Sequence, residues 1–151
     1  MIDKGELLSV VPHRGKMLLL SRVISYDLEE QSIEAEYHVT EDCLFYDPAL
    51  GGVPAWVGFE FMAQSISALS GLRNREKGFP PQNGFVLAVS QLRMGLSFFE
   101  TGSKITIRTR EIDNMHPVYI FEGEILLDGK KVLGGKITVM EADNENEKKA
   151  D

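Results

Sequence analysis

The chain has 151 residues, a formal net charge of −7 and 43% hydrophobic residues, which are the proportions of one globular domain. This composition excludes collagen-like, low-complexity and wholly disordered chains. The single cysteine, Cys43, cannot form an internal disulfide, and neither a secretory leader nor a membrane-spanning apolar window is visible. We therefore expect a cytoplasmic protein.

The negative charge is unevenly distributed along the chain. Residues 141–151 hold five carboxylates and two lysines, so this segment contributes −3 and the remainder −4. Because the segment has almost no apolar side chains, we expect a disordered acidic tail after a single domain at residues 1–140. The negative charge of residues 1–140 argues against nucleic-acid binding, because phosphate backbones bind basic surfaces.

The N-terminal third predicts a short helical segment, a β-hairpin and a loop. Residues 2–11 are weakly amphipathic and end at a breaker cluster, residues 12–15. Apolar runs and apolar–polar alternation predict strands at 17–27 and 32–40, joined by a turn. Residues 43–54 follow neither period and contain two prolines and two glycines, which indicates a shaped loop.

A long helix is predicted at residues 55–75, because apolar side chains recur there every three or four residues. Pro54 suits its first turn, and a surface that is apolar almost all round predicts burial. The remaining strands are predicted at 85–94, 103–112, 117–127 and 131–140, with a tight hairpin at Asp128-Gly129. One buried helix among about six mostly antiparallel strands predicts an α+β fold whose curved sheet encloses the helix.

Glu60 is the strongest candidate for chemistry in this pattern. It lies about one and a half turns into the apolar helix, where desolvation raises a carboxyl pKa toward the range of a general acid or base. Gln64 lies one turn further on the same face, and the free amides at residues 55–57 can polarise a carbonyl. The structural alternative is that Glu60 reaches the rim of the sheet or pairs with an arginine, and that Gln64 is a structural hydrogen-bonding group.

Metal and cofactor motifs are missing from the sequence. Three histidines and Cys43 do not stand at metal-ligand spacing, and no phosphate-binding loop or nucleophile elbow occurs, so we expect no metal and no cofactor. His38 and His116 are interpreted as structural or surface residues. His13 follows Pro12 in the breaker cluster and is the histidine to test first.

Two segments resemble bacterial 3-hydroxyacyl-ACP dehydratases. Residues 12–23, PHRGKMLLLSRV, are similar to that family's PHR-x-P-x-L-L-x-D-R-V opening. Residues 53–64, VPAWVGFEFMAQ, are similar to its helix motif V/M-P-G-V-L-x-x-E-A-M-A-Q. The form GGVPAW-x-G-x-E-x-MAQ resembles in particular the dehydratase-like subunit of aryl-polyene gene clusters. The resemblance covers nearly the whole chain except the tail and implies a hot-dog fold, in which a curved antiparallel sheet wraps one long helix.

The resemblance also implies a reaction, the elimination of water from a 3-hydroxyacyl thioester in fatty-acid or polyene synthesis. In that family a loop histidine removes the α-proton, a helix acid from the other subunit handles the leaving hydroxyl, and a backbone amide binds the thioester oxygen. Glu60 matches the helix acid and Ala55 the amide donor, and Trp56 and Gln64 complete the candidate substrate-binding residues. The implied partners are an acyl carrier protein and a second hot-dog chain, in a homodimer or heterodimer.

The sequence departs from the family at the catalytic histidine. Counting back eight residues from Pro54 gives Tyr46, and a tyrosine with an ordinary pKa of about 10 is a poor base near neutrality. Three possibilities stay open: His13 acts instead, a partner subunit supplies the histidine, or the chain is a non-catalytic subunit that binds acyl chains. Thioester hydrolysis is a further alternative, because hot-dog thioesterases use a helix carboxylate to activate water.

An acidic carrier needs a local basic patch on this acidic chain. The candidates are the cations at the end of the predicted helix, Arg73, Arg75 and Lys77.

Overall fold

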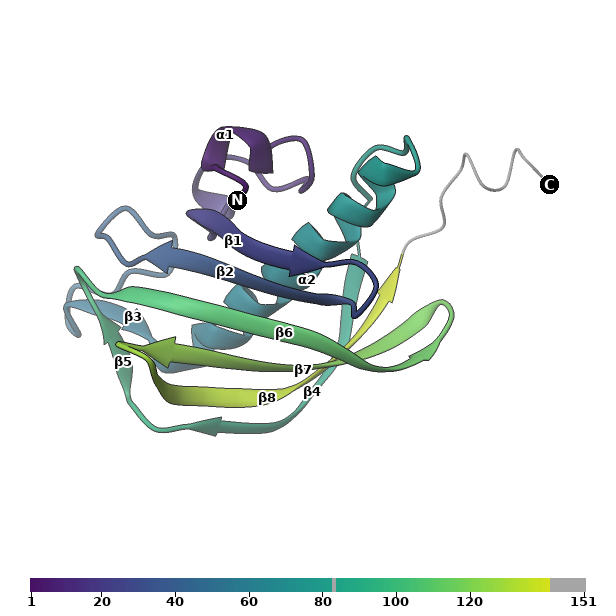
Figure 1. Cartoon of the computed structure of the whole chain (residues 1–151). Coiled ribbons are helices and arrows are strands. Elements are labelled where there is room, and N and C mark those ends of the chain that lie inside the picture. The colour runs from purple at the N-terminus through teal and green to yellow at the C-terminus, as the bar shows by residue number, and fades with distance from the viewer. Residues whose placement is uncertain (83, 142–151) are drawn as a thin grey trace.

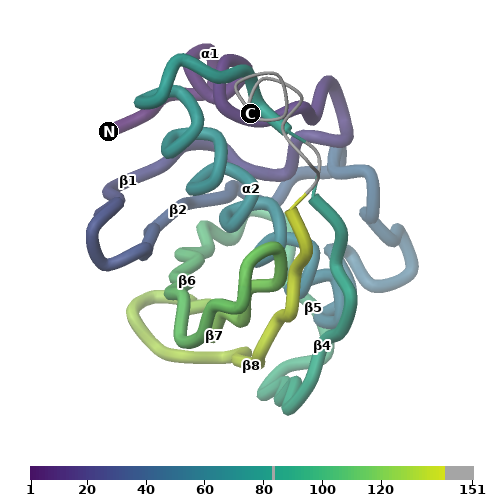
Figure 2. Tube along the Cα trace, turned by 90° about the vertical axis from the view of Figure 1, so that its right-hand side faces the viewer, coloured from purple at the N-terminus to yellow at the C-terminus, as the bar shows by residue number. Residues whose placement is uncertain are grey.

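A six-stranded antiparallel sheet forms most of the molecule in the computed structural model, which describes residues 1–82 and 84–141. Its strands lie in the order β1 (Arg22–Asp27), β2 (Ser32–His38), β6 (Lys104–Met115), β7 (Val118–Leu127), β8 (Lys130–Glu141) and β4 (Gly84–Met94). The sheet curves around one long helix, α2 (Gly58–Glu76) (Figure 1, Figure 2). The predicted architecture of an enclosed helix is thus confirmed.

The inner face of the sheet carries the apolar half of each alternating strand. On β6 the side chains of Ile105 and Ile107 are fully buried, and on β7 Ile125 is buried in the same way. They pack with Phe61 and other buried α2 residues in one hydrophobic core. Gly123 lies among them because α2 passes close: a Cβ there would lie 2.5 Å from Sδ of Met62. The sheet and helix are therefore matched in shape as well as in polarity.

The start of α2 differs from the prediction by one turn. A 3-10 turn, η2 (Ala55–Val57), precedes the helix, and Pro54 is the last residue of strand β3 (Gly52–Pro54) rather than part of the first helical turn. The helix ends at Glu76, and Gly78 adopts a left-handed conformation with φ of 80°, as expected for a glycine after a helix.

Two short strands occur where loops were predicted. β3 pairs with β5 (Phe98–Glu100) in a separate two-stranded sheet, and each strand is three residues long. Such strands are too short for alternation to be visible in the sequence. The predicted strand at 17–27 begins only at Arg22, after the 3-10 turn η1 (Gly15–Met17), because the buried run Leu18–Leu20 packs into the core instead.

The two edges of the main sheet are different. Beside β1, Ile2 exchanges two backbone hydrogen bonds with Val23 just before the short helix α1 (Lys4–Leu7). At the other edge, β4 has no neighbouring strand within the described residues. Its apolar residues Phe85, Val86 and Leu87 are exposed by 44–53%. One edge is therefore partly covered and the other is open within the described residues.

The C-terminal boundary also shifts by one residue. Glu141, which the sequence analysis assigns to the tail, is the last residue of β8, and residues 142–151 lie outside the described part. Among the described residues, no helix is long and apolar enough to cross a membrane.

Candidate functional site

A cavity of about 220 Å³ lies along α2 and contains the leading candidate residue. Glu60, Gln64 and Ser67 line it from the helix, and His13 lines it from the loop after α1. The start of β4 and the inner faces of β7 and β8 form the rest of its wall. The structure therefore brings together two titratable groups that are 47 positions apart in the sequence.

The Glu60 carboxyl has no polar partner among the described residues, in contrast to the structural alternative of an arginine pair. The side chain is half-buried, and this burial raises the pKa of Glu60 above its ordinary range. A raised pKa keeps a larger fraction of the carboxyl protonated near neutrality. Glu60 is thereby suited to deliver a proton.

His13 is shifted in the opposite direction. Two causes lower the pKa of His13 below its ordinary value: burial is the larger, and the positive charge of neighbouring Arg14 is the smaller. Its Nδ1 atom is buried and makes no hydrogen bond to any residue in the described part of the chain. A neutral imidazole with a free ring nitrogen is suited to accept a proton.

Gln64 holds the segment that follows His13 against the helix. Its Oε1 accepts a hydrogen bond of 2.6 Å from the Leu19 amide, and its Nε2 donates one of 2.6 Å to the Met17 carbonyl. Both polar groups of the buried side chain are thus used within the protein. The geometry supports the structural reading of Gln64, as the residue that positions the loop bearing His13.

The far end of the cavity is polar. Arg73 donates to Gln31 Oε1 at 2.5 Å and pairs with Glu141, and its guanidinium lies 5.6 Å from the ring centre of Tyr119. Ser70 Oγ also donates to Glu141, at 3.0 Å. The sequence analysis named Arg73 only as a candidate contact for an acidic carrier and did not predict this polar group. Only Ser70 carried a usable signal, because it lies on the same helix face as Glu60 and Ser67.

The other three candidates lie outside this cavity. Tyr46 is part of the loop before β3, packed against the core, and does not line the cavity. Trp56 is 48% exposed and packs between Phe45 and Phe59, with ring centres at 5.8 and 6.3 Å. These positions do not bring either side chain to Glu60.

The expected role of Ala55 is contradicted by its hydrogen bond. The Ala55 amide donates to the Ser97 carbonyl at 3.0 Å, because the β3–β5 pairing continues to this residue. This N–H is therefore not free to bind a thioester oxygen. The sequence could not reveal this, since Ser97 lies in a segment predicted as a loop.

The remaining histidines have structural contacts, as expected. His38 Nε2 lies 2.8 Å from Glu36, and His116 Nδ1 lies 3.0 Å from the Tyr119 hydroxyl. Across residues 1–82 and 84–141, no group of three His, Cys, Asp or Glu side chains is placed to hold a metal ion.

The sequence of this chain matches a known family. The sequence pattern of a family described as ApeP-like, ApeP dehydratase, matches residues 6–150. The chain belongs to the ApeP-like dehydratase family. The fold agrees: a chain of the dehydratase heterocomplex ApeI:P from Xenorhabdus doucetiae superposes with a TM-score of 0.83 at 24% identity, covering 95% of each chain.

Curated relatives of this ApeP-like chain carry the name 3-hydroxyacyl-[acyl-carrier-protein] dehydratase FabZ. The FabZ of Lactococcus lactis subsp. cremoris is 26% identical over 140 residues, which cover 91% of this chain and 93% of the relative. The FabZ of Chlamydia caviae is 41% identical over 74 residues, 47% of this chain and 48% of the relative. The match with this chlamydial relative thus covers about half of each chain. The predicted hot-dog dehydratase family is confirmed.

Proposed function

We propose that this ApeP-like chain dehydrates a 3-hydroxyacyl thioester carried by an acyl carrier protein, with Glu60 as the acid and His13 as the base. The supporting observation is that both side chains line one cavity and that their pKa values are shifted in opposite directions. Environments that shift the pKa values of two titratable groups in opposite directions are typical of acid–base pairs.

The reaction balances with these two groups. His13 removes the proton from C2, the electron pair of that bond forms the C2–C3 double bond, and the C3–O bond breaks. Glu60 protonates the departing hydroxyl, which leaves as water. The products are a 2-enoyl thioester, protonated His13 and ionised Glu60, and one proton transfer between them through water restores the starting state.

A second candidate is a mixed site in which a partner hot-dog chain supplies the histidine to Glu60. Two features support it: the sequence resemblance places Tyr46 at the family's histidine position, and the apolar edge of β4 is open within the described residues. The solved ApeI:P relative is named as a heterocomplex. In this candidate the chain is a dehydratase subunit, and His13 is a structural residue.

The experiment compares the chain alone with the chain mixed with a histidine-bearing hot-dog dehydratase, each given a 3-hydroxyacyl-carrier substrate. We expect enoyl product from the chain alone, and a loss of about 10²–10⁴-fold in kcat for both Glu60→Gln and His13→Gln, the range for a lost acid or base. Glu76→Gln, at the end of the same helix, is the matched control and should keep full rate.

The outcomes separate the candidates. Activity that appears only in the mixture, and that survives His13→Gln but not Glu60→Gln, favours the mixed site. Free acid in place of enoyl thioester would identify a thioesterase. No product in either setting would contradict the dehydratase proposal. The cytoplasmic location stays a prediction.

A further inference from the structure

Arg14, the residue after His13, binds backbone carbonyls instead of a carboxylate. Its Nη1 donates to the carbonyls of Val11 and His13, both at 2.8 Å, and its Nη2 donates to the Leu8 carbonyl at 2.8 Å. Arg14 forms no ion pair with any residue in the described part of the chain. One guanidinium thus collects three carbonyl oxygens from the loop after α1, an arrangement that we call the Arg14 clamp.

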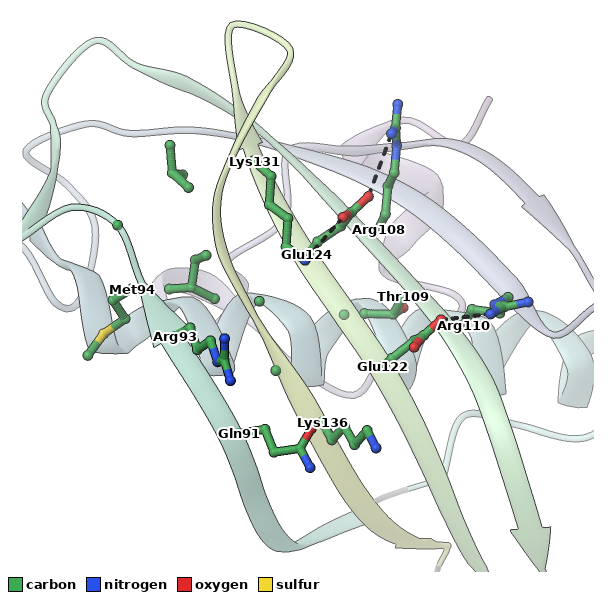
Figure 3. Close-up of a pocket in the computed structure, with 16 residues that line it drawn as sticks. Gln91, Arg93, Met94, Arg108, Thr109, Arg110, Glu122, Glu124, Lys131 and Lys136 are labelled. Atoms are coloured by element: carbon green, nitrogen blue, oxygen red, sulfur yellow. Dashed lines mark hydrogen bonds and ion pairs between the residues drawn. The ribbon is translucent and has the colours of Figure 1, made fainter.

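The arginines of β6 show how different this arrangement is. On the outer face of the sheet, Arg108 lies 3.7 Å from Glu124 and Arg110 lies 2.7 Å from Glu122 (Figure 3). These ion pairs join β6 to β7, two strands that backbone hydrogen bonds already hold in register. The three carbonyls of the clamp accept no backbone hydrogen bond within the described residues. Arg14 therefore supplies the partners that a helix or a sheet supplies elsewhere.

The loop that carries His13 is attached to α2 on both sides of this residue. Before His13, the backbone oxygen of Val10 lies so close to α2 that a Cβ on Gly71 would be 1.6 Å from it. After His13, Gly15 turns the chain with a φ of 59°, and Gln64 binds two backbone groups further along. The clamp fixes the residues between these two attachments, and His13 is one of them.

The ring of His13 is not oriented by a hydrogen bond at Nδ1. A histidine that acts as a base is commonly held by a third group that binds its second ring nitrogen. The Nδ1 atom of His13 is buried and has no such partner in the part of the chain that the structure describes. The direction of the imidazole is then set by its backbone and by packing. Because one clamped carbonyl belongs to His13 itself, Arg14 fixes the backbone from which the ring projects.

Arg14 also affects His13 through its charge. Burial lowers the pKa of His13, and the charge of Arg14 lowers it further. The other charged groups that line the cavity are Glu60 and Arg73 on α2 and Glu141 on β8, and the last two pair with each other. A substitution at Arg14 therefore acts through its hydrogen bonds and through its charge, and the two effects need separate variants.

We infer that Arg14 is a positioning residue for dehydration, whose fork of hydrogen bonds to three carbonyls holds the imidazole of His13 in the cavity that contains Glu60. The inference rests on the proposed function for the role of His13 as the base. Lysine has one nitrogen at the end of a flexible side chain and cannot reproduce the fork, so a positive charge alone should not replace Arg14.

The test follows the His13 ring by NMR in the full chain, with its signal identified by its loss in His13→Gln. Arg14→Lys keeps the charge and removes the fork. We expect a more mobile ring on the picosecond–nanosecond timescale and a kcat about 10- to 10²-fold lower, the scale for a misplaced catalytic group. Arg14→Gln also removes the charge and should raise the pKa of His13 further. The acidic limb of its kcat/KM profile should then move to higher pH, because the base must be unprotonated.

The matched controls are Arg75→Lys and Arg75→Gln. Arg75 pairs with Glu6 at 2.8 Å and so ties α1 itself to α2. These variants should leave the His13 signal and kcat unchanged. Equal effects of the Arg75 and Arg14 variants, full kcat in Arg14→Lys, or an unchanged ring in Arg14→Gln would each overturn the inference.

The inference and the proposed function can fail separately. If His13→Gln keeps the full rate, His13 is not the base, and the proposed assignment of the reaction fails. The mobility of the ring in the Arg14 variants still decides whether Arg14 orients His13. A ring that stays ordered in both Arg14 variants contradicts the clamp even if the chain dehydrates its substrate.

Discussion

Two glutamates show how neighbouring groups decide what a buried carboxyl does. Glu60 is half-buried without a polar partner among the described residues, and burial raises its pKa. Glu36 is only 2% exposed, and burial alone would raise its pKa too, but hydrogen bonds from His38 and Arg22 and the charges of Arg22 and Lys104 lower it overall. The first is suited to proton transfer and the second to holding β1 against β2.

The lowered pKa of Glu36 predicts a pH-dependent contribution to stability. An ionised Glu36 stabilises the fold fully above the pKa of the unfolded side chain, and this contribution is lost as the pH falls through the lower folded pKa. We therefore expect Glu36→Gln to reduce the free energy of unfolding by about 2 kcal/mol at pH 7, the scale of a buried charged hydrogen bond. Urea unfolding between pH 7 and pH 3 measures this.

A matched control lies two residues away on the same strand. Glu34 also pairs with an arginine, Arg108 at 2.8 Å, but that arginine is 53% exposed. Such surface pairs contribute about 0–1 kcal/mol, so Glu34→Gln should change stability little at any pH. If the difference in unfolding free energy between the wild type and Glu36→Gln does not decrease at low pH, the charge of Glu36 is not what stabilises the fold.

At the scale of elements, the packing of α2 depends on one glycine. Gly71 lies inside the helix, where alanine is normally favoured by about 1 kcal/mol. However, a Cβ at this position would lie 1.6 Å from the backbone oxygen of Val10, in the segment after α1. Backbone cannot give way as a flexible side chain can, so the steric cost exceeds the gain in helix propensity.

Gly71→Ala should therefore destabilise the protein, with a net loss of about 1–3 kcal/mol as for an overpacked core. Thermal unfolding followed by circular dichroism checks the loss. Glu76→Ala, at the exposed end of α2, should be neutral or slightly stabilising. A Gly71→Ala variant as stable as the wild type would show that the N-terminal segment moves away without cost.

Most elements could be predicted locally, and the exceptions share a cause. The helix and the main strands are long enough for periods of 3.6 and 2 to be visible. The β3–β5 pair is too short, and its strands meet only because segments 46 positions apart in the chain, at Val53 and Phe99, come together. The same pairing engages the Ala55 amide in a hydrogen bond to Ser97. The prediction of loops at β3 and β5 and the prediction of a free Ala55 amide therefore failed for the same reason.

At the scale of the whole molecule, the two sheet edges predict how the chain associates. The β1 edge is partly covered by Ile2, whereas β4 presents exposed Phe85, Val86 and Leu87 at an open edge. An open apolar edge strand is a template for pairing with another strand. We therefore expect a dimer joined through β4.

Leu87→Lys should convert that dimer to a monomer, because a charge on the edge strand opposes pairing. Leu87 is 52% exposed and does not line the Glu60 cavity, so the change tests association rather than the site. Light scattering after size exclusion gives the mass. Tyr26→Lys, at 40% exposure on the β1 edge, should leave the dimer intact; equal disruption by both variants would contradict the β4 interface.

By itself the sequence determined that one apolar helix is enclosed by antiparallel strands and that Glu60 lies near the start of that helix, because periodicity and local position are properties of neighbouring residues. Only the tertiary structure decided that His13 shares a cavity with Glu60 and that the Ser97 carbonyl accepts the hydrogen bond of the Ala55 amide. Each of these depends on contacts between segments far apart in the chain, which no local pattern records.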